Sequence, residues 1–263
     1  MKAKLDWEAL QIDTAGVTAV LIFCMTFAAT ALSAMSGGGS SIITVPVFLS
    51  LGLSLPLAMS VQQLCCMSWV LPVSSVYLRG RKIDWGFLLS FSVIGLIGAF
   101  FGVRTLMMVD QHILSRIIGI IILALVAFTF IHRDFGLQKH NTSTAFSRGG
   151  SYFFALILGF YEAIFGAGNG IFFSILAVKL RGFDFKNALG YYYAVCFPWI
   201  VLATILLIAQ GYFSLAITIP AVAGSVLGGY LGSKFAVYKG NRFIKMVFVV
   251  IGGVLGIKLV LGY

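Results

Sequence analysis

The chain has 263 residues, of which 60% are hydrophobic and 10% are charged. Soluble domains carry about 25% charged residues, so this composition excludes an ordinary soluble protein and indicates a polytopic α-helical membrane protein. The formal net charge of +10 does not indicate nucleic-acid binding, because the basic residues gather in short loops, where they act as topology signals.

Apolar segments suited to membrane helices follow one another along the chain. In the first half we expect them at 15–35, 41–53, 56–78, 84–108 and 112–131. After a polar stretch, the second half places them at 150–165, 171–180, 187–209, 213–236 and 243–262. The segments 41–53 and 171–180 are short for a full crossing of about 20 residues, so we predict half-helices there. Whether these two cross the membrane or fold back stays open.

The two halves align without a gap at an offset of 130 residues, which places Trp69 on Trp199 and Cys66 on Cys196. The glycine-rich stretches and the lengths of the apolar segments match in the same register. This periodicity predicts a duplicated unit. The predicted parts are a first transmembrane repeat over 1–132, a linker over 133–149 and a second transmembrane repeat over 150–263.

Loop charge indicates how the two copies are oriented. Loop 79–84 ("RGRKID") carries three basic residues, and its counterpart 209–214 ("AQGYFS") carries none. Conversely, loop 179–186 ("KLRGFDFK") carries three, and its counterpart 49–56 ("LSLGLSLP") carries none. Basic loops stay in the cytoplasm, so equivalent loops are expected on opposite sides of the membrane. The sequence therefore predicts inverted-topology repeats, with a cytoplasmic linker and both termini outside.

A glycine-rich break precedes each short segment: "SGGGS" over 36–40 and "GAGNG" over 166–170. The N-terminus of a half-helix presents free backbone N–H groups and the positive end of the helix dipole, which suits an anion. We expect both termini to share one ligand. The alternative is that the glycines only permit close helix packing, as expected for the GxxxG pairs Gly98/Gly102 and Gly228/Gly232. The candidate substrate-binding residues of the breaks are Ser36, Gly37, Gly38, Gly39, Ser40, Ser41, Gly166, Gly168, Asn169 and Gly170.

Glu162 stands just before the second break and is the one acid expected deep in the membrane. A carboxylate at that depth marks an ion or proton path, so we predict that Glu162 carries a coupling proton. The alternative is a carboxylate that only caps a helix end. Gln62 and Tyr192 align with each other in the helices after the short segments and are further candidates for substrate binding. Their neighbours Gln63 and Tyr193 align equally well, and the sequence does not choose between the pairs.

Other conspicuous residues have structural interpretations. Cys24, Cys65, Cys66 and Cys196 lie in apolar segments without metal-ligand spacing, so they are expected to be small core residues. We expect packing roles for Trp69 and Trp199, and topology or snorkelling roles for Arg104 and Lys234. The sequence contains no zinc-protease, nucleophile-elbow or Walker A motif, so no enzyme, metal site or cofactor is predicted.

Four stretches resemble the sulfite exporter TauE/SafE family: "SGGGSSIITVPVFLSLGLSLPLA", "GFYEAIFGAGNG", "GAFFG" and "GGYLG". The resemblance extends over essentially the whole chain. It implies an integral bacterial plasma-membrane permease for sulfite, sulfonates such as sulfoacetate, or related sulfur and organic oxyanions, commonly moved outward. Ser36 and Ser40 stand where glycine is frequent in the family, so their hydroxyls are expected to tune the choice of substrate.

The leading hypothesis is a multi-pass secondary transporter of the bacterial inner membrane that exports a small anion by alternating access. Its expected partners are the anion, the lipid bilayer and protons as coupling ion, with no nucleic acid; the oligomeric state stays open, with a homodimer among the options. Two alternatives remain. One is an anion channel, and the other is a membrane scaffold or accessory subunit that transports nothing.

Overall fold

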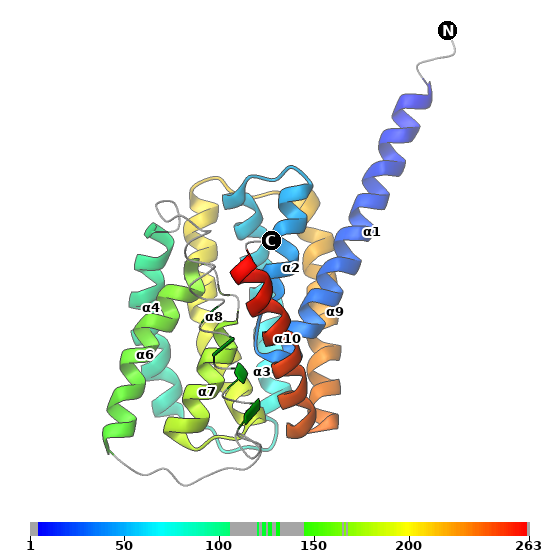
Figure 1. Cartoon of the computed structure of the whole chain (residues 1–263). Helices are drawn as coiled ribbons and strands as arrows, with labels where there is room; N and C mark the ends of the chain where they lie inside the picture. The colour runs from blue at the N-terminus through cyan, green and yellow to red at the C-terminus, as the bar shows by residue number, and fades with distance from the viewer. Residues whose placement is uncertain are drawn as a thin grey trace.

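The computed structural model describes residues 5–105, 120, 123–124, 126–127, 130–131, 145–164, 166 and 168–261. The regular elements in these residues are α-helices, which confirms the predicted all-α fold (Figure 1). They are α1 Leu5–Ser36, α2 Ser40–Ser50, α3 Leu55–Leu78, α4 Trp85–Thr105, α6 Ala145–Ile164, α7 Asn169–Arg181, α8 Phe185–Ala209, α9 Leu215–Lys239 and α10 Asn241–Leu261. The predicted segment 112–131 and the linker up to residue 144 lie largely outside the described residues.

Five helices among the described residues are long and apolar enough to cross a membrane: Gly16–Ser36, Pro56–Leu78, Trp85–Thr105, Phe185–Ala209 and Leu215–Lys239. Their outward faces are apolar as well. On α4, for example, Leu89 and Phe101 are 58% and 56% exposed. An apolar surface of this extent is unfavourable in water, whereas it matches the hydrocarbon core of a lipid bilayer. The chain is therefore a multi-pass membrane protein.

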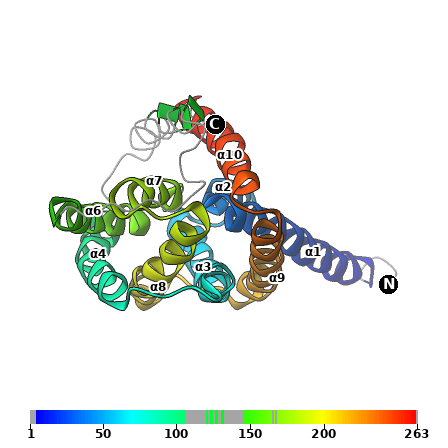
Figure 2. The ribbon, with the colours of Figure 1, turned by 90° about the horizontal axis from the view of Figure 1, so that it is seen from below.

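The helices pack in three pairs. Figure 2 shows α1 with α9 on one side, α4 with α6 on the other, and α3 with α8 between them. Small residues allow the outer pairs to approach closely. A Cβ on Gly98 would overlap the carbonyl oxygen of Leu156 in α6, and one on Gly228 would overlap that of Phe27 in α1. The predicted packing role of the GxxxG glycines is confirmed.

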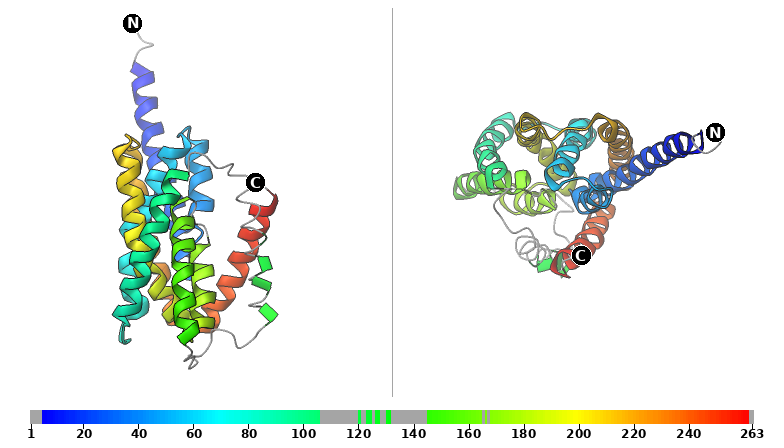
Figure 3. Two further views of the ribbon diagram at one scale, coloured as in Figure 1. Left: turned by 90° about the vertical axis from the view of Figure 1, so that its left-hand side faces the viewer. Right: turned by 90° about the horizontal axis from the view of Figure 1, so that it is seen from above.

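The short helices α2 and α7 follow the two breaks, as predicted. α2 ends at Ser50, beside the start of α3, whereas α7 ends at Arg181, beside the start of α8. α2 lies in the upper part of the bundle and α7 in the lower part (Figures 1 and 3). From breaks that face each other, the two helices thus run to opposite ends of the molecule. The N-terminal part of α1 projects beyond the bundle (Figure 3).

Two crossed ion pairs join the loops at the lower end of the bundle. Arg81 contacts Asp184 at 3.0 Å, and Arg181 contacts Asp84 at 2.6 Å. Each aspartate also accepts a hydrogen bond from a backbone N–H of the helix that follows it. Asp84 accepts from the first turn of α4, and Asp184 accepts from the first turn of α8. The guanidinium of Arg181 lies 4.3 Å from the centre of the Phe87 ring. The two basic loops that precede α4 and α8 therefore lie at the same end of the molecule.

α6 differs from the expected element. It begins at Ala145, inside the stretch 133–149 that the sequence analysis assigns to the linker. Hydropathy locates the edge of the hydrocarbon layer, but backbone hydrogen bonding continues a helix into the polar region beyond it. The first turns of α6 are therefore helical although their sequence, "AFSRGG", is not a membrane-spanning one.

Candidate functional site

The first break interrupts the chain between α1 and α2. Gly37, Gly38 and Gly39 have positive φ angles of 89°, 120° and 116°, which residues with a side chain rarely adopt. The N–H groups of Gly37 and Gly38 both donate to the carbonyl of Ser33 at 3.0 Å and complete the end of α1. No side chain of the described residues caps α2, which begins at Ser40. The N-terminus of α2 therefore presents backbone N–H groups without a capping side chain.

The second break, between α6 and α7, is built around the carboxylate of Glu162. Gly166 and Gly168 have positive φ angles of 64° and 74°. Glu162 is 5% exposed, and its Oε2 accepts hydrogen bonds from Asn169 Nδ2 at 2.5 Å and from the Tyr192 hydroxyl at 3.0 Å. A Cβ on Gly166 would stand 3.0 Å from Oε1 of the same carboxylate. Glu162 thus places a carboxylate beside the N-terminus of α7.

The two breaks touch each other through their backbones. A Cβ on Gly170 would overlap the carbonyl oxygen of Gly37, and one on Gly38 would stand 3.5 Å from the nitrogen of Gly168. The same position is 3.7 Å from the nitrogens of Asn169 and Gly170. The first break therefore covers the N-terminus of α7, which is why the two helix termini are not equivalent.

A cavity of about 30 Å³ lies beside the first break. This volume holds roughly one or two water molecules, which is less than a sulfur oxyanion needs. Its walls come from both halves of the chain. The lining residues are Ser33, Gly38, Gly39, Ser40, Ser41, Met59, Gln62, Gln63, Cys66, Trp69, Val70, Glu162, Gly166, Tyr192, Tyr193, Cys196 and Ile200.

The predicted site residues divide into two groups. Those that line the cavity are Gly38, Gly39, Ser40, Ser41, Gln62, Glu162, Gly166 and Tyr192. Those outside the lining are Ser36, Gly37, Gly168, Asn169 and Gly170, which shape the breaks instead. The Ser36 hydroxyl, for instance, lies 3.0 Å from the carbonyl of Leu32 and 3.1 Å from that of Gly38. The residues of the first break therefore face the cavity more fully than those of the second.

Gln62 is held in one orientation by neighbours on α2 and α3. Its Oε1 accepts a hydrogen bond from Thr44, and its Nε2 donates to Ser40 Oγ at 3.0 Å and to Cys66 Sγ at 3.2 Å. Ser40 Oγ accepts from Gln62, and the Ser40 hydroxyl, which also interacts with the Cys66 thiol, keeps its own proton as a donor. This network fixes a hydroxyl donor at the start of α2.

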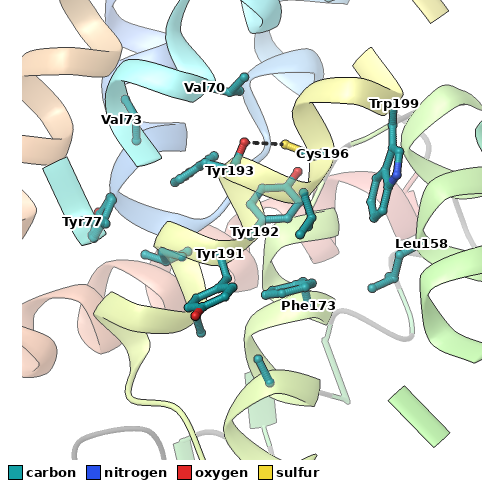
Figure 4. Close-up of a cluster of buried hydrophobic side chains, with 14 of the residues drawn as sticks. Val70, Val73, Tyr77, Leu158, Phe173, Tyr191, Tyr192, Tyr193, Cys196 and Trp199 are labelled. Atoms are coloured by element: carbon teal, nitrogen blue, oxygen red, sulfur yellow. Dashed lines mark hydrogen bonds between the residues drawn. The ribbon is translucent and has the colours of Figure 1, made fainter. Parts of the chain in front are cut away.

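Three consecutive tyrosines point in different directions, as expected on a helix (Figure 4). The Tyr191 hydroxyl accepts the N–H of Asp84 at the lower end of the bundle. Tyr192 donates to Glu162, and Tyr193 donates to the carbonyl of Ser33 at 2.7 Å. Of the two aligned pairs that the sequence left open, both therefore reach the cavity wall, and Tyr192 is the tyrosine that contacts the buried acid.

Several lining residues were assigned only to packing by the sequence analysis. They include Trp69 and the aligned cysteines Cys66 and Cys196. The signal that singles them out is their position: each lies on α3 or α8, the two helices that pack in the centre of the bundle. Residue type alone conceals this, because tryptophan and cysteine are common in apolar cores.

Charge within the cavity wall is sparse. Among the described lining residues, Glu162 is the one with an ionisable carboxyl group, and none is lysine or arginine. An anion there would be stabilised by backbone N–H groups, hydroxyls and the positive end of the α2 dipole. It would be repelled by Glu162 unless that carboxyl were protonated.

A multi-pass helical protein whose interrupted helices meet around a buried polar cavity has the construction of a membrane transporter. The chain belongs to the sulfite exporter TauE/SafE family: the sequence model of that family matches residues 21–259. It is thus a member of a transporter family and not an enzyme.

Curated relatives carry transporter names. The chain is 25% identical over 240 residues to "Probable membrane transporter protein" of Haemophilus influenzae, covering 91% of this chain and 93% of that one. It is 25% identical over 243 residues to "Probable membrane transporter protein ORF9" of Sinorhizobium sp, covering 90% of each. It is 21% identical over 243 residues to "Probable membrane transporter protein YfcA" of Escherichia coli K12, covering 91% and 88%. No solved structure gives a significant match.

Proposed function

We propose that the chain is a secondary transporter that exports a small oxyanion by alternating access. The substrate class is sulfite, a sulfonate such as sulfoacetate, or a related sulfur or organic oxyanion. The observation that carries the proposal is the N-terminus of α2, which lacks a capping side chain and opens into a buried cavity rich in hydrogen-bond donors. Such a terminus binds anions without a basic side chain. The family's description as a sulfite exporter supports the substrate class.

Glu162 supplies the coupling in this proposal. An anion at the start of α2 and an ionised Glu162 would share one small cavity, where Coulomb repulsion is strong. Uptake of a proton by the carboxyl removes that repulsion, so anion and proton occupy the cavity together. Anion and proton then cross together, so net export occurs where the outward gradient of the anion exceeds the opposing inward gradient of protons. Glu162 keeps Tyr192 and Asn169 as hydrogen-bond partners.

The transporter in this account consists of two inverted repeats, 1–132 and 150–263, joined by the linker 133–149. Three features support this arrangement. The offset of 130 residues makes α1 equivalent to α6 and α4 equivalent to α9, so the contacting pairs α1–α9 and α4–α6 are equivalent to each other. It also makes α3 equivalent to α8, and these two helices pack against each other. The equivalent glycine pairs lie in these contacts: Gly98 and Gly102 of α4 pack against α6, and Gly228 and Gly232 of α9 pack against α1. The equivalent helices α2 and α7 run to opposite ends.

The orientation in the membrane follows from the loops. The basic loops joined by Arg81–Asp184 and Arg181–Asp84 lie at one end, which we assign to the cytoplasm by the positive-inside rule. The bacterial relatives support a location in the bacterial inner membrane. Opening of the cytoplasmic end would require the crossed ion pairs to separate, so they belong to the closed state of that side.

Counterflow in proteoliposomes tests the proposed function. Vesicles loaded with unlabelled sulfite, sulfoacetate, sulfate or acetate are diluted into labelled sulfite, with and without a pH gradient. We expect labelled sulfite to accumulate transiently against internal sulfite or sulfoacetate, because a carrier exchanges substrate across one site. An anion channel would equilibrate the label without an overshoot. A non-transporting scaffold would give the flux of protein-free vesicles with every anion.

A further inference from the structure

Trp69 and Trp199 occupy equivalent positions in α3 and α8, yet their indole nitrogens have different surroundings. Trp199 Nε1 donates to the carbonyl of Ser92 at 2.7 Å, and Trp199 does not line the cavity. Trp69 is 2% exposed, and its Nε1 has no hydrogen-bond partner in the part of the chain that the structure describes. One tryptophan is therefore satisfied by the fold, and the other is not.

The tryptophan with the unsatisfied nitrogen, Trp69, is one of the residues that line the cavity. Among the described lining residues, Trp69 alone has a buried side-chain nitrogen or oxygen without a partner. The side chain of Trp69 packs closely against Gly229 of α9: its Cβ, Cγ and Cε3 atoms lie 2.9–3.0 Å from the position that a Cβ on Gly229 would occupy. Cε3 belongs to the side of the indole away from Nε1. The ring thus packs on α9 with the edge that does not carry the N–H group.

A buried donor without an acceptor is destabilising, so proteins rarely retain one without a reason. Trp69 shares the cavity with the Ser40 hydroxyl and with the N-terminus of α2. These groups are all donors. An indole N–H can only donate, so a ligand that satisfies it must supply an acceptor. An oxyanion supplies several acceptor atoms at once.

We propose that Trp69 is a substrate-binding residue whose indole N–H donates to an oxygen of the transported anion, opposite the N-terminus of α2. The inference rests on the proposed function and deepens it, since it assigns a specific donor to the oxyanion. It also makes the site asymmetric: the first repeat supplies the helix terminus and the indole, and the second repeat supplies Glu162 and Tyr192. Trp199, the equivalent residue, is structural.

The test compares Trp69→Phe with the matched control Trp199→Phe. Sulfite and sulfoacetate binding are measured by titration calorimetry of purified protein in detergent. A hydrogen bond to a charged group is worth about 1.5–3 kcal/mol, so W69F should raise the dissociation constant roughly tenfold or more. W199F removes the indole hydrogen bond to the Ser92 carbonyl, so it should lower the unfolding temperature and leave anion affinity unchanged. Equal affinity of W69F and wild type would overturn the inference and would indicate that the indole serves a resident water.

A second readout follows the indole resonances in protein that retains Trp69. The sequence has four tryptophans, so protein labelled with ¹⁵N in the indole ring gives four resonances to follow during sulfite titration. We expect one resonance to shift, and to persist in the single variants Trp7→Phe, Trp85→Phe and Trp199→Phe. Loss of the shifting resonance in one of these three variants would contradict the assignment to Trp69. If wild-type protein binds neither anion by calorimetry, the proposed function fails and this inference fails with it.

Discussion

Replacement of Glu162 by glutamine is expected to abolish transport driven by a pH gradient and to leave sulfite counterflow intact. Glutamine has nearly the same shape as glutamic acid, and its carbonyl oxygen can still accept from Asn169 Nδ2 and the Tyr192 hydroxyl. It cannot release a proton, so the cavity stays in its neutral form. Exchange of one anion for another needs only that form, whereas net proton-coupled movement needs both.

The measurement is labelled sulfite flux in proteoliposomes under two regimes. An imposed pH gradient should drive accumulation with wild type and only background flux with E162Q. Equal concentrations of sulfite on both sides, without a gradient, should give similar exchange for both. Glu162→Asp is the matched control, because it keeps a titratable carboxyl and should keep gradient-driven flux at a reduced rate. Gradient-driven accumulation by E162Q at the wild-type level would refute the coupling role.

Gly170→Ala should separate the two breaks and destroy the cavity. The added Cβ would overlap the carbonyl oxygen of Gly37 and stand 2.6 Å from Cδ1 of Tyr192. The first obstacle is backbone and cannot rotate away, so the N-terminus of α7 must move. Such overpacking costs about 1–3 kcal/mol, and the displaced α7 would carry Asn169 away from Glu162.

Thermal unfolding in detergent and anion titration measure this effect together. We expect G170A to unfold at a lower temperature than wild type and to lose measurable sulfite binding. Gly16→Ala in α1 and Gly253→Ala in α10 are the controls, because a Cβ at either position meets nothing within 4 Å. Alanine favours a helix by about 1 kcal/mol over glycine, so the controls should be as stable as wild type. Wild-type binding by G170A would show that contact between the breaks is not needed.

Much of the fold could be predicted because each membrane-spanning helix requires a long apolar segment, which hydropathy detects directly. The boundaries of α3, α4, α8 and α9 follow the apolar segments closely, since lipid requires an uninterrupted apolar stretch and water at the ends does not. The glycines of the breaks and the GxxxG pairs were found for a similar reason: missing side chains are conspicuous in a sequence. α6 extends beyond its apolar part, where hydropathy carries no information.

The candidate site was predicted only in part, because it depends on which groups meet in space. The sequence gives two equivalent breaks, but packing makes them unequal: the backbone at Gly37 and Gly38 covers α7, and α2 faces the cavity. No spacing rule reveals that Trp69 lacks a partner whereas Trp199 has one. The crossed ion pairs had a detectable signal, the matching "RKID" and "RGFD" of the two loops, each of which places its arginine three residues before a helix-capping aspartate.

Crystallographic localisation of a bound anion would show whether the two breaks form its binding site. Selenite has the geometry of sulfite and scatters anomalously, so diffraction at the selenium edge from crystals soaked in selenite would locate it without interpretation of the surrounding chain. We expect one strong peak in the cavity between the N-terminus of α2 and the indole of Trp69, with the wall expanded around it. Peaks confined to the molecular surface, for example beside Arg242 and Lys245 in the hollow that borders α10, would contradict an anion site at the two breaks.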